Sequence, residues 1–158
     1  PNVIVSLCRL ALPVALIVIG FVSPLRAMDA LWQSEILFHV NAARIAQGLA
    51  PLQWDARLAA AAAVHGSDLQ TCKRLAHDGC GGSTLPQRVT GAGFSLRRAS
   101  ENLALCPCDA ATVVRLWLGS EGHRRNLLDP DVSALGADTR IDTADLRRQQ
   151  WVLVMGRE

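Results

Sequence analysis

The stretch from Ser100 to Asp129 constrains the fold more than any other part of this 158-residue sequence. It begins with a strand-like run that carries Glu101 and continues as a helix, which we expect to end at residues 120–123 (SEGH). Strand alternation places Glu101 on the same side as Leu103 and Leu105, a side that we expect to be covered. A buried carboxylate is costly unless it is paired or binds a metal, so Glu101 is either a structural glutamate or part of a site.

Residues 10–22 (LALPVALIVIGFV) form an apolar run that follows Arg9. The run is shorter than the about 20 residues of a membrane-spanning helix and is typical of the centre of a signal peptide. We expect residues 1–27 to be a signal peptide, N-terminally incomplete because the sequence starts at Pro1, with cleavage near Ala27–Ala30. An uncleaved anchor is the alternative. A cleaved chain would be secreted or periplasmic and would have no stable membrane span.

The charge pattern argues against nucleic acid as a partner. The formal net charge is only +2, and arginine supplies nearly all of the positive charge. No basic block is longer than the pairs at 97–98, 124–125 and 147–148. We expect these pairs to be solvated, with a phosphate or anionic-lipid site as the alternative.

The cysteines predict an exported domain that is cross-linked by disulfides. Cys8 precedes the apolar run, which leaves four of the five cysteines for the rest of the chain. An even number of cysteines in an exported protein indicates disulfides. We expect Cys72 to pair with Cys80 across a short loop, and Cys106 could then pair with Cys108. Cross-pairing between the two groups is the alternative, whereas a zinc site of four thiolates is disfavoured because the spacing lacks Cys-x-x-Cys.

Helical periodicity covers the first part of the chain after residue 30. A helix over 31–49 is expected to bury a stripe of Phe38, Ala42, Ile45 and Leu49. A second helix, capped by Asp55, is expected to pack through Leu58, Ala62, His65 and Leu69. We expect His65 to be a packed histidine with one hydrogen bond rather than a ligand.

The rest of the chain predicts a mixed fold. A short helix over 85–94 precedes the Glu101 strand, and Asp109 can cap a third long helix. Alternation over 135–141 indicates a half-buried strand, and the apolar run over 149–155 indicates a strand that is covered on both sides. These elements predict the α+β class, with a three-layer α-β-α sandwich around an antiparallel central sheet.

Several motifs together resemble one protein family. The run Glu101-Asn-Leu-Ala, followed by Trp117-x-x-Ser120-x-Gly-His123-Arg, resembles the CAP superfamily in its short bacterial secreted form. This superfamily comprises cysteine-rich secretory, antigen 5 and pathogenesis-related 1 proteins. The resemblance covers about residues 31–155 and implies one CAP/SCP domain over 31–156 with the same sandwich fold.

The resemblance also implies a site. CAP domains bring a loop histidine, the Glu-Asn-Leu-Ala glutamate, a glutamate of the next helix and a Gly-His histidine to one groove. His77, Glu101 and His123 take three of these places, and such donors suit zinc or another divalent cation. The helix glutamate falls at Ser120 here. Glu121 is the candidate substitute, although it points about 100° away around a helix.

The function that we expect is that of a non-enzymatic exported CAP-domain protein. Its groove would bind a lipid, a small molecule or a protein, with or without a metal at His77, Glu101 and His123. One alternative is a serine- or metal-dependent hydrolase that uses Ser120, His123 and Glu101, although no Gly-x-Ser-x-Gly motif is present. Another alternative is a purely structural envelope protein.

Overall fold

The computed structural model describes residues 24–158, and the surroundings of side chains from residue 31 onward. The predicted apolar run lies outside these residues, so the signal peptide and its cleavage stay predictions. Across residues 24–158, no helix is both long and apolar enough to cross a membrane. The elements are α1 (Pro24–Ala46), β1 (Gln53–Trp54), α2 (Ala56–Cys72), α3 (Leu85–Gly91), β2 (Arg98–Leu105), α4 (Ala110–Gly119), α5 (Glu121–Leu127), β3 (Ala134–Asp142) and β4 (Asp145–Arg157).

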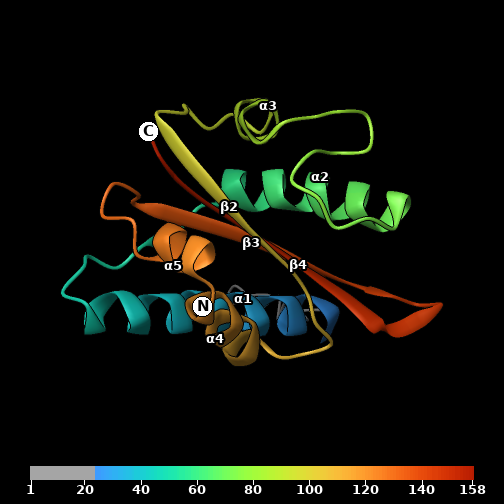
Figure 1. Ribbon diagram of the computed structural model, residues 1–158, viewed down its shortest axis with the longest axis horizontal. Helices are drawn as coiled ribbons and strands as arrows, with labels where there is room; N and C mark the ends of the chain where they lie inside the picture. Colours follow the sequence, from blue (N-terminus) through green and yellow to red (C-terminus); the bar gives the residue numbers. More distant parts are fainter. Residues whose placement is uncertain (1–23) are drawn as a thin grey trace, which may run out of the picture.

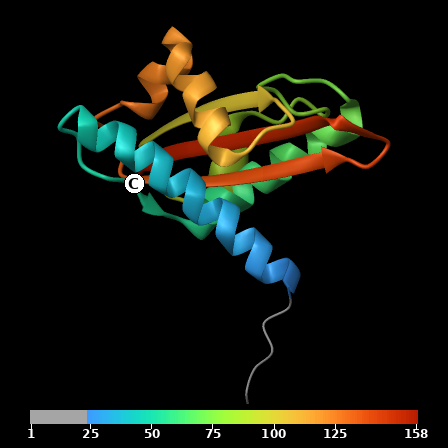
Figure 2. The same cartoon turned by 90° about the horizontal axis from the view of Figure 1, so that it is seen from below.

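A four-stranded sheet forms the middle layer, in the order β1-β3-β4-β2. Strand β4 pairs antiparallel with β3 and β2, whereas the short β1 pairs parallel with β3. Helices α2 and α3 cover one face of the sheet, and α1, α4 and α5 lie on the other (Figure 1). Seen from below, α1 crosses the sheet in front of the strands (Figure 2). The predicted α+β class and three-layer arrangement are confirmed, with β1 as an unpredicted parallel addition.

Strand β4 divides the core between the two helical layers. Its odd-numbered side chains from Trp151 to Met155 pack with α1 and α4, whereas Val152 and Val154 pack with α2 and α3. All of these side chains are buried, as expected for the continuous apolar run that predicted a strand covered on both sides.

The buried face of α1 differs from the predicted stripe. Phe38 and Ile45 are 66% and 61% exposed, whereas Ile36, Val40 and Arg44 are buried. The Arg44 guanidinium is satisfied by three backbone carbonyl groups, those of Ala50, Leu127 and Asp129. Because these contacts allow an arginine to occupy a core position, counting apolar residues alone placed the stripe on the wrong side of the helix.

The chain after β2 forms two helices where one was predicted. Asp109 caps α4 as expected, since its carboxylate accepts from the Thr112 amide at 2.8 Å. Ser120 is extended, with φ −103° and ψ 125°, and separates α4 from α5. The sequence predicted His123 at the end of a helix, but it lies inside α5.

Gly136 allows α2 to lie directly on β3. A Cβ atom at this position would lie 2.0 Å from the Ala59 amide nitrogen and 2.5 Å from the Leu58 carbonyl carbon. Backbone atoms inside a helix cannot give way as the end of a flexible side chain can. The absence of a side chain at Gly136 is therefore a packing requirement of the sandwich.

We predict that Gly136→Ala lowers the free energy of unfolding by about 1–3 kcal/mol, because α2 must move off the sheet. Urea denaturation of the oxidised chain would measure this loss. Gly119→Ala is the matched control, since nothing lies within 4 Å of the added Cβ. Equal stability of Gly136→Ala and Gly119→Ala would contradict the close approach of α2 and β3.

Candidate functional site

Glu101 lies on β2, the edge strand of the sheet, and its side chain is 2% exposed. The carboxylate points to the α2–α3 side, together with Leu103, as strand parity predicted. One carboxylate oxygen accepts from Arg88 Nη2 at 2.8 Å, and the other accepts from His77 Nδ1 at 2.9 Å. Glu101 is therefore buried as expected, but side chains satisfy it rather than backbone amides.

Arg88, on α3, is the functional residue that the sequence did not reveal. Its side chain is 2% exposed and pairs with Glu101. The same guanidinium donates to the backbone carbonyls of Ser83 at 2.8 Å and His77 at 3.1 Å. Arg88 therefore neutralises the buried carboxylate and also holds the loop that carries His77. The available signal was the buried glutamate itself, which requires a cation.

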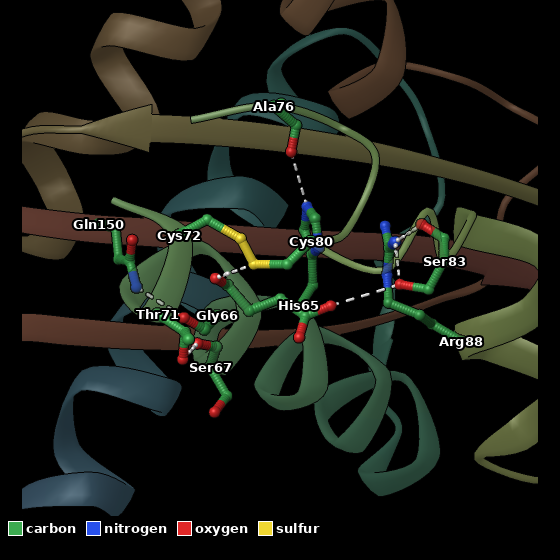
Figure 3. Close-up of a disulfide and its surroundings, with 11 residues drawn as sticks. His65, Gly66, Ser67, Thr71, Cys72, Ala76, Cys80, Ser83, Arg88 and Gln150 are labelled. Carbon is green, nitrogen blue, oxygen red and sulfur yellow. Dashed lines mark hydrogen bonds between the residues drawn. A yellow bond between two sulfur atoms is a disulfide. The ribbon is translucent and has the colours of Figure 1, made fainter. Parts of the chain in front are cut away.

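The loop between α2 and α3 presents His77. Cys72 and Cys80 form a disulfide that closes this loop, as predicted (Figure 3). Because the Glu101 carboxylate only accepts hydrogen bonds, His77 Nδ1 carries the proton, and the lone pair of the neutral ring is on Nε2. The imidazole is 64% exposed, and among the described residues no hydrogen bond engages Nε2.

His123 reaches the same edge of the sheet from α5. Its ring is partly buried, and its backbone carbonyl accepts from Asn102 Nδ2 at 3.0 Å. Asn126 in turn donates to Asn102 Oδ1 at 2.9 Å, which fixes α5 to β2. Burial, and to a smaller extent the charge that His77 carries whenever it is protonated, lower the pKa of His123 below 6.5, so this imidazole is neutral at pH 7.

The other two predicted residues, Ser120 and Glu121, make contacts outside this group of residues. Glu121 is 75% exposed and forms an ion pair with Arg125 at 3.2 Å on the surface of α5. Ser120 lies between the two helices, and its backbone amide donates to the Trp117 carbonyl. In the described part of the chain, no hydrogen bond joins the Ser120 hydroxyl to an imidazole. The same residues contain no group of three or more His, Cys, Asp or Glu side chains that could hold a metal ion.

His65 lies behind the site, on the buried face of α2, as predicted. Its Nε2 is 2.9 Å from the Ala76 carbonyl (Figure 3). The same nitrogen is 3.7 Å from Glu101 Oε1. Because the carbonyl is an acceptor, Nε2 carries the proton, and the buried Nδ1 has no partner in the described structure. Burial lowers the pKa of His65 below 6.5, although the Glu101 charge opposes this shift.

The second pair of cysteines, Cys106 and Cys108, also forms a disulfide, with a Cα–Cα distance of 5.3 Å. The bridge follows β2 directly and precedes the cap of α4. Both bridges agree with the expected local pairing and differ from cross-pairing and from a thiolate zinc site.

The sequence matches the CAP family, the cysteine-rich secretory protein family, over residues 37–154. The chain belongs to the CAP family. It is 34% identical over 104 residues to the Bacillus subtilis (strain 168) membrane protein YlbC, a match that covers 66% of this chain and 30% of YlbC. The identity to YkwD of the same organism is 28% over 121 residues, covering 77% of this chain and 47% of YkwD.

Solved structures of CAP proteins show the same fold. An extracellular protein of Bacillus anthracis str. Ames that contains an SCP domain superimposes with a TM-score of 0.73 and 26% identity. That match covers 88% of this chain and 45% of the B. anthracis chain. This chain thus spans less than half the length of these three relatives. The predicted resemblance to the CAP superfamily is confirmed.

We predict that Arg88→Met lowers the free energy of unfolding by roughly 3–5 kcal/mol, because it leaves the Glu101 carboxylate buried without a cation. The double variant Arg88→Met/Glu101→Leu is expected to recover a large part of this loss, since both charges are then removed. Urea denaturation of the two single variants and the double variant would give the coupling energy. Additive losses would contradict the pairing of Arg88 and Glu101.

His65 makes the stability of the fold depend on pH. In the folded state His65 takes up a proton at a lower pH than in the unfolded state, whose pKa is the ordinary 6.5. The contribution of neutral His65 to the free energy of unfolding is therefore complete above pH 6.5. This contribution is lost as the pH falls from about 6.5 through the lower folded pKa, by up to about 1.4 kcal/mol per pH unit.

We predict that in His65→Gln the free energy of unfolding falls less steeply between pH 7 and about pH 5 than in the wild type. His39→Gln, on α1, is the control and is expected to keep the wild-type slope; an equal slope in His65→Gln would contradict the prediction.

Proposed function

We propose that this CAP domain is a non-enzymatic binding module that acts outside the cytoplasm and recognises its ligand at the imidazoles of His77 and His123. One observation carries the proposal: a buried, charge-neutralised Glu101 holds His77 by Nδ1, and the Nε2 lone pair remains available at the surface. A histidine that only supported the fold would not need an exposed nitrogen. A hydrogen-bond donor of a lipid, a small molecule or a protein, or a metal ion, is the occupant that such a lone pair favours.

The proposal includes a divalent cation as the ligand's anchor, with a changed role for Glu101. His77 Nε2 and the neutral His123 ring are nitrogen donors that suit zinc, and a carboxylate that orients a ligating imidazole is a common outer-shell partner. Glu101 itself does not fit as a ligand, because its two oxygens are engaged by Arg88 and His77. Zinc would act there as a Lewis acid that anchors the ligand, which together with water would complete the coordination.

The arrangement favours binding over hydrolysis. The His77–Glu101 pair is like the base and orienting acid of a catalytic triad, but the predicted nucleophile, Ser120, forms no hydrogen bond with either imidazole in residues 31–158. Ser120 instead occupies the junction of α4 and α5, where its conformation supports the turn between the helices.

Export is part of the proposal. Two disulfides suit an oxidising compartment, and the B. anthracis relative is an extracellular protein. The apolar run at residues 10–22 would supply the export signal.

Zinc binding tests this function directly. We predict that calorimetry on the oxidised chain at pH 7.4 shows one zinc site, with affinity at least about tenfold weaker in His77→Ala and in His123→Ala, since each variant removes one of two donors. His39→Ala should bind as the wild type does. Binding should also weaken in acid, because protons compete with zinc for a ligating imidazole.

The outcomes separate the alternatives. Unchanged zinc affinity in the His77→Ala/His123→Ala double variant, or no binding by the wild type, would overturn the metal part of the proposal. Covalent labelling of Ser120 by a fluorophosphonate, lost in Ser120→Ala, would show an activated serine and contradict the non-enzymatic assignment.

A further inference from the structure

One arginine pair of the sequence, Arg124 and Arg125, and one member of a second pair, Arg98, line one open pocket of about 540 Å³. Arg98 contributes from the start of β2, and Arg124 and Arg125 contribute from α5. The remaining lining residues are Asn126, Leu128, Asp129 and Pro130. The volume is in the range of ligand pockets and exceeds that of a phosphate group.

Positive charge dominates this pocket. Three arginines and one carboxylate, that of Asp129, line it; Asp129 forms an ion pair with Arg98, and the charge of Asp131 also acts on Arg98. Arg125 pairs with Glu121, but both side chains are about three-quarters exposed, at 73% and 75%, and such pairs are weak. Arg124 reaches only the Leu118 carbonyl, at 3.4 Å.

A fourth cation lies beneath the pocket. Arg44 is 1% exposed and donates to the carbonyls of Leu127 and Asp129, at 2.8 and 2.9 Å. No described carboxylate forms a hydrogen bond with Arg44, although the charge of Asp129 acts on it through space and favours its charged form. A charge held in a low-dielectric interior acts on its surroundings more strongly than one in water.

The pocket is also held in shape before any ligand arrives. The bonds from Arg44 fix the turn that follows α5, and Asp129 accepts from the Asp131 amide at 2.9 Å through its other oxygen. Asp129 thereby orients Arg98 toward the pocket. Arg44 already donates to the Leu127 carbonyl at the end of α5. Arg124 and Arg125 are therefore not required to satisfy that carbonyl group.

We propose that this pocket binds a phosphate group, carried by a free phosphate compound or by the headgroup of an anionic phospholipid. The planar donors of arginine match phosphate oxygens in pairs, and three guanidinium groups exceed what Asp129 neutralises. This site is independent of zinc binding at His77 and His123, because none of its lining residues belongs to that pair.

The test measures two probes on the oxidised wild-type chain in low salt. Calorimetry measures the affinity for pyrophosphate. Co-sedimentation compares binding to vesicles that contain phosphatidylglycerol with binding to vesicles of phosphatidylcholine alone. Arg124→Gln/Arg125→Gln is expected to lower the affinity for the probe that binds by at least about tenfold, because two of the pocket's charge-assisted contacts are lost. The matched control, Arg147→Gln/Arg148→Gln, removes the same charge from the third arginine pair on the β3–β4 hairpin and should change affinity less than about twofold.

Each outcome bears on the proposal. Binding of pyrophosphate but not of vesicles supports a free phosphate compound, whereas binding of phosphatidylglycerol vesicles alone supports a headgroup. Equal weakening by the two double variants would overturn the pocket, since net charge alone would then explain binding; so would no binding of either probe. Circular dichroism would verify folding, and Arg98→Gln provides a second variant on another element, expected to weaken binding in the same way.

Discussion

The buried charge of Glu101 is the interaction on which the site and much of its surroundings depend. A carboxylate under the α2–α3 layer requires a cation, and Arg88 supplies it from α3 at 2.8 Å. Once placed there, the Arg88 guanidinium also reaches the His77 carbonyl, so one ion pair joins the edge strand, a helix and the disulfide-closed loop. Removing either charge would therefore affect stability and the orientation of His77 together.

Side chains, and not another strand, form hydrogen bonds with the outer edge of β2. Trp117 donates its indole N–H to the Leu103 carbonyl at 3.0 Å, and Asn126 approaches the Glu101 carbonyl at 3.3 Å. These contacts cover backbone acceptors that would otherwise invite pairing with a second chain. They also attach α4 and α5 to the strand that carries Glu101, which brings His123 to the edge where His77 lies.

Most of the fold followed from patterns that are local in the sequence. Asp55 and Asp109 cap helices where expected, and the apolar run of β4 is buried on both sides. Besides the break between α4 and α5 at Ser120, the errors concern arginines whose role depends on distant partners. Arg44 takes a core position because carbonyls far along the chain receive it, and Arg88 meets a carboxylate on another element. Neither partnership leaves a periodic signal. Glu101 is buried as predicted, but Arg88 and His77 engage its two oxygens, an arrangement that the prediction of a metal-ligating carboxylate did not include.

Helix α5 carries residues of both proposed sites, His123 of one and Arg124 and Arg125 of the other. It has only seven residues, too few to be stable alone, and is held by Asn102 through the His123 carbonyl and by Arg44 through the Leu127 carbonyl. These two anchors lie toward opposite ends of the helix, so His123 and the neighbouring arginines Arg124 and Arg125 keep fixed positions relative to each other. A ligand that carries both a metal-binding group and a phosphate could engage both sites through a single rigid element. The second contact would then form without a further cost of ordering the protein.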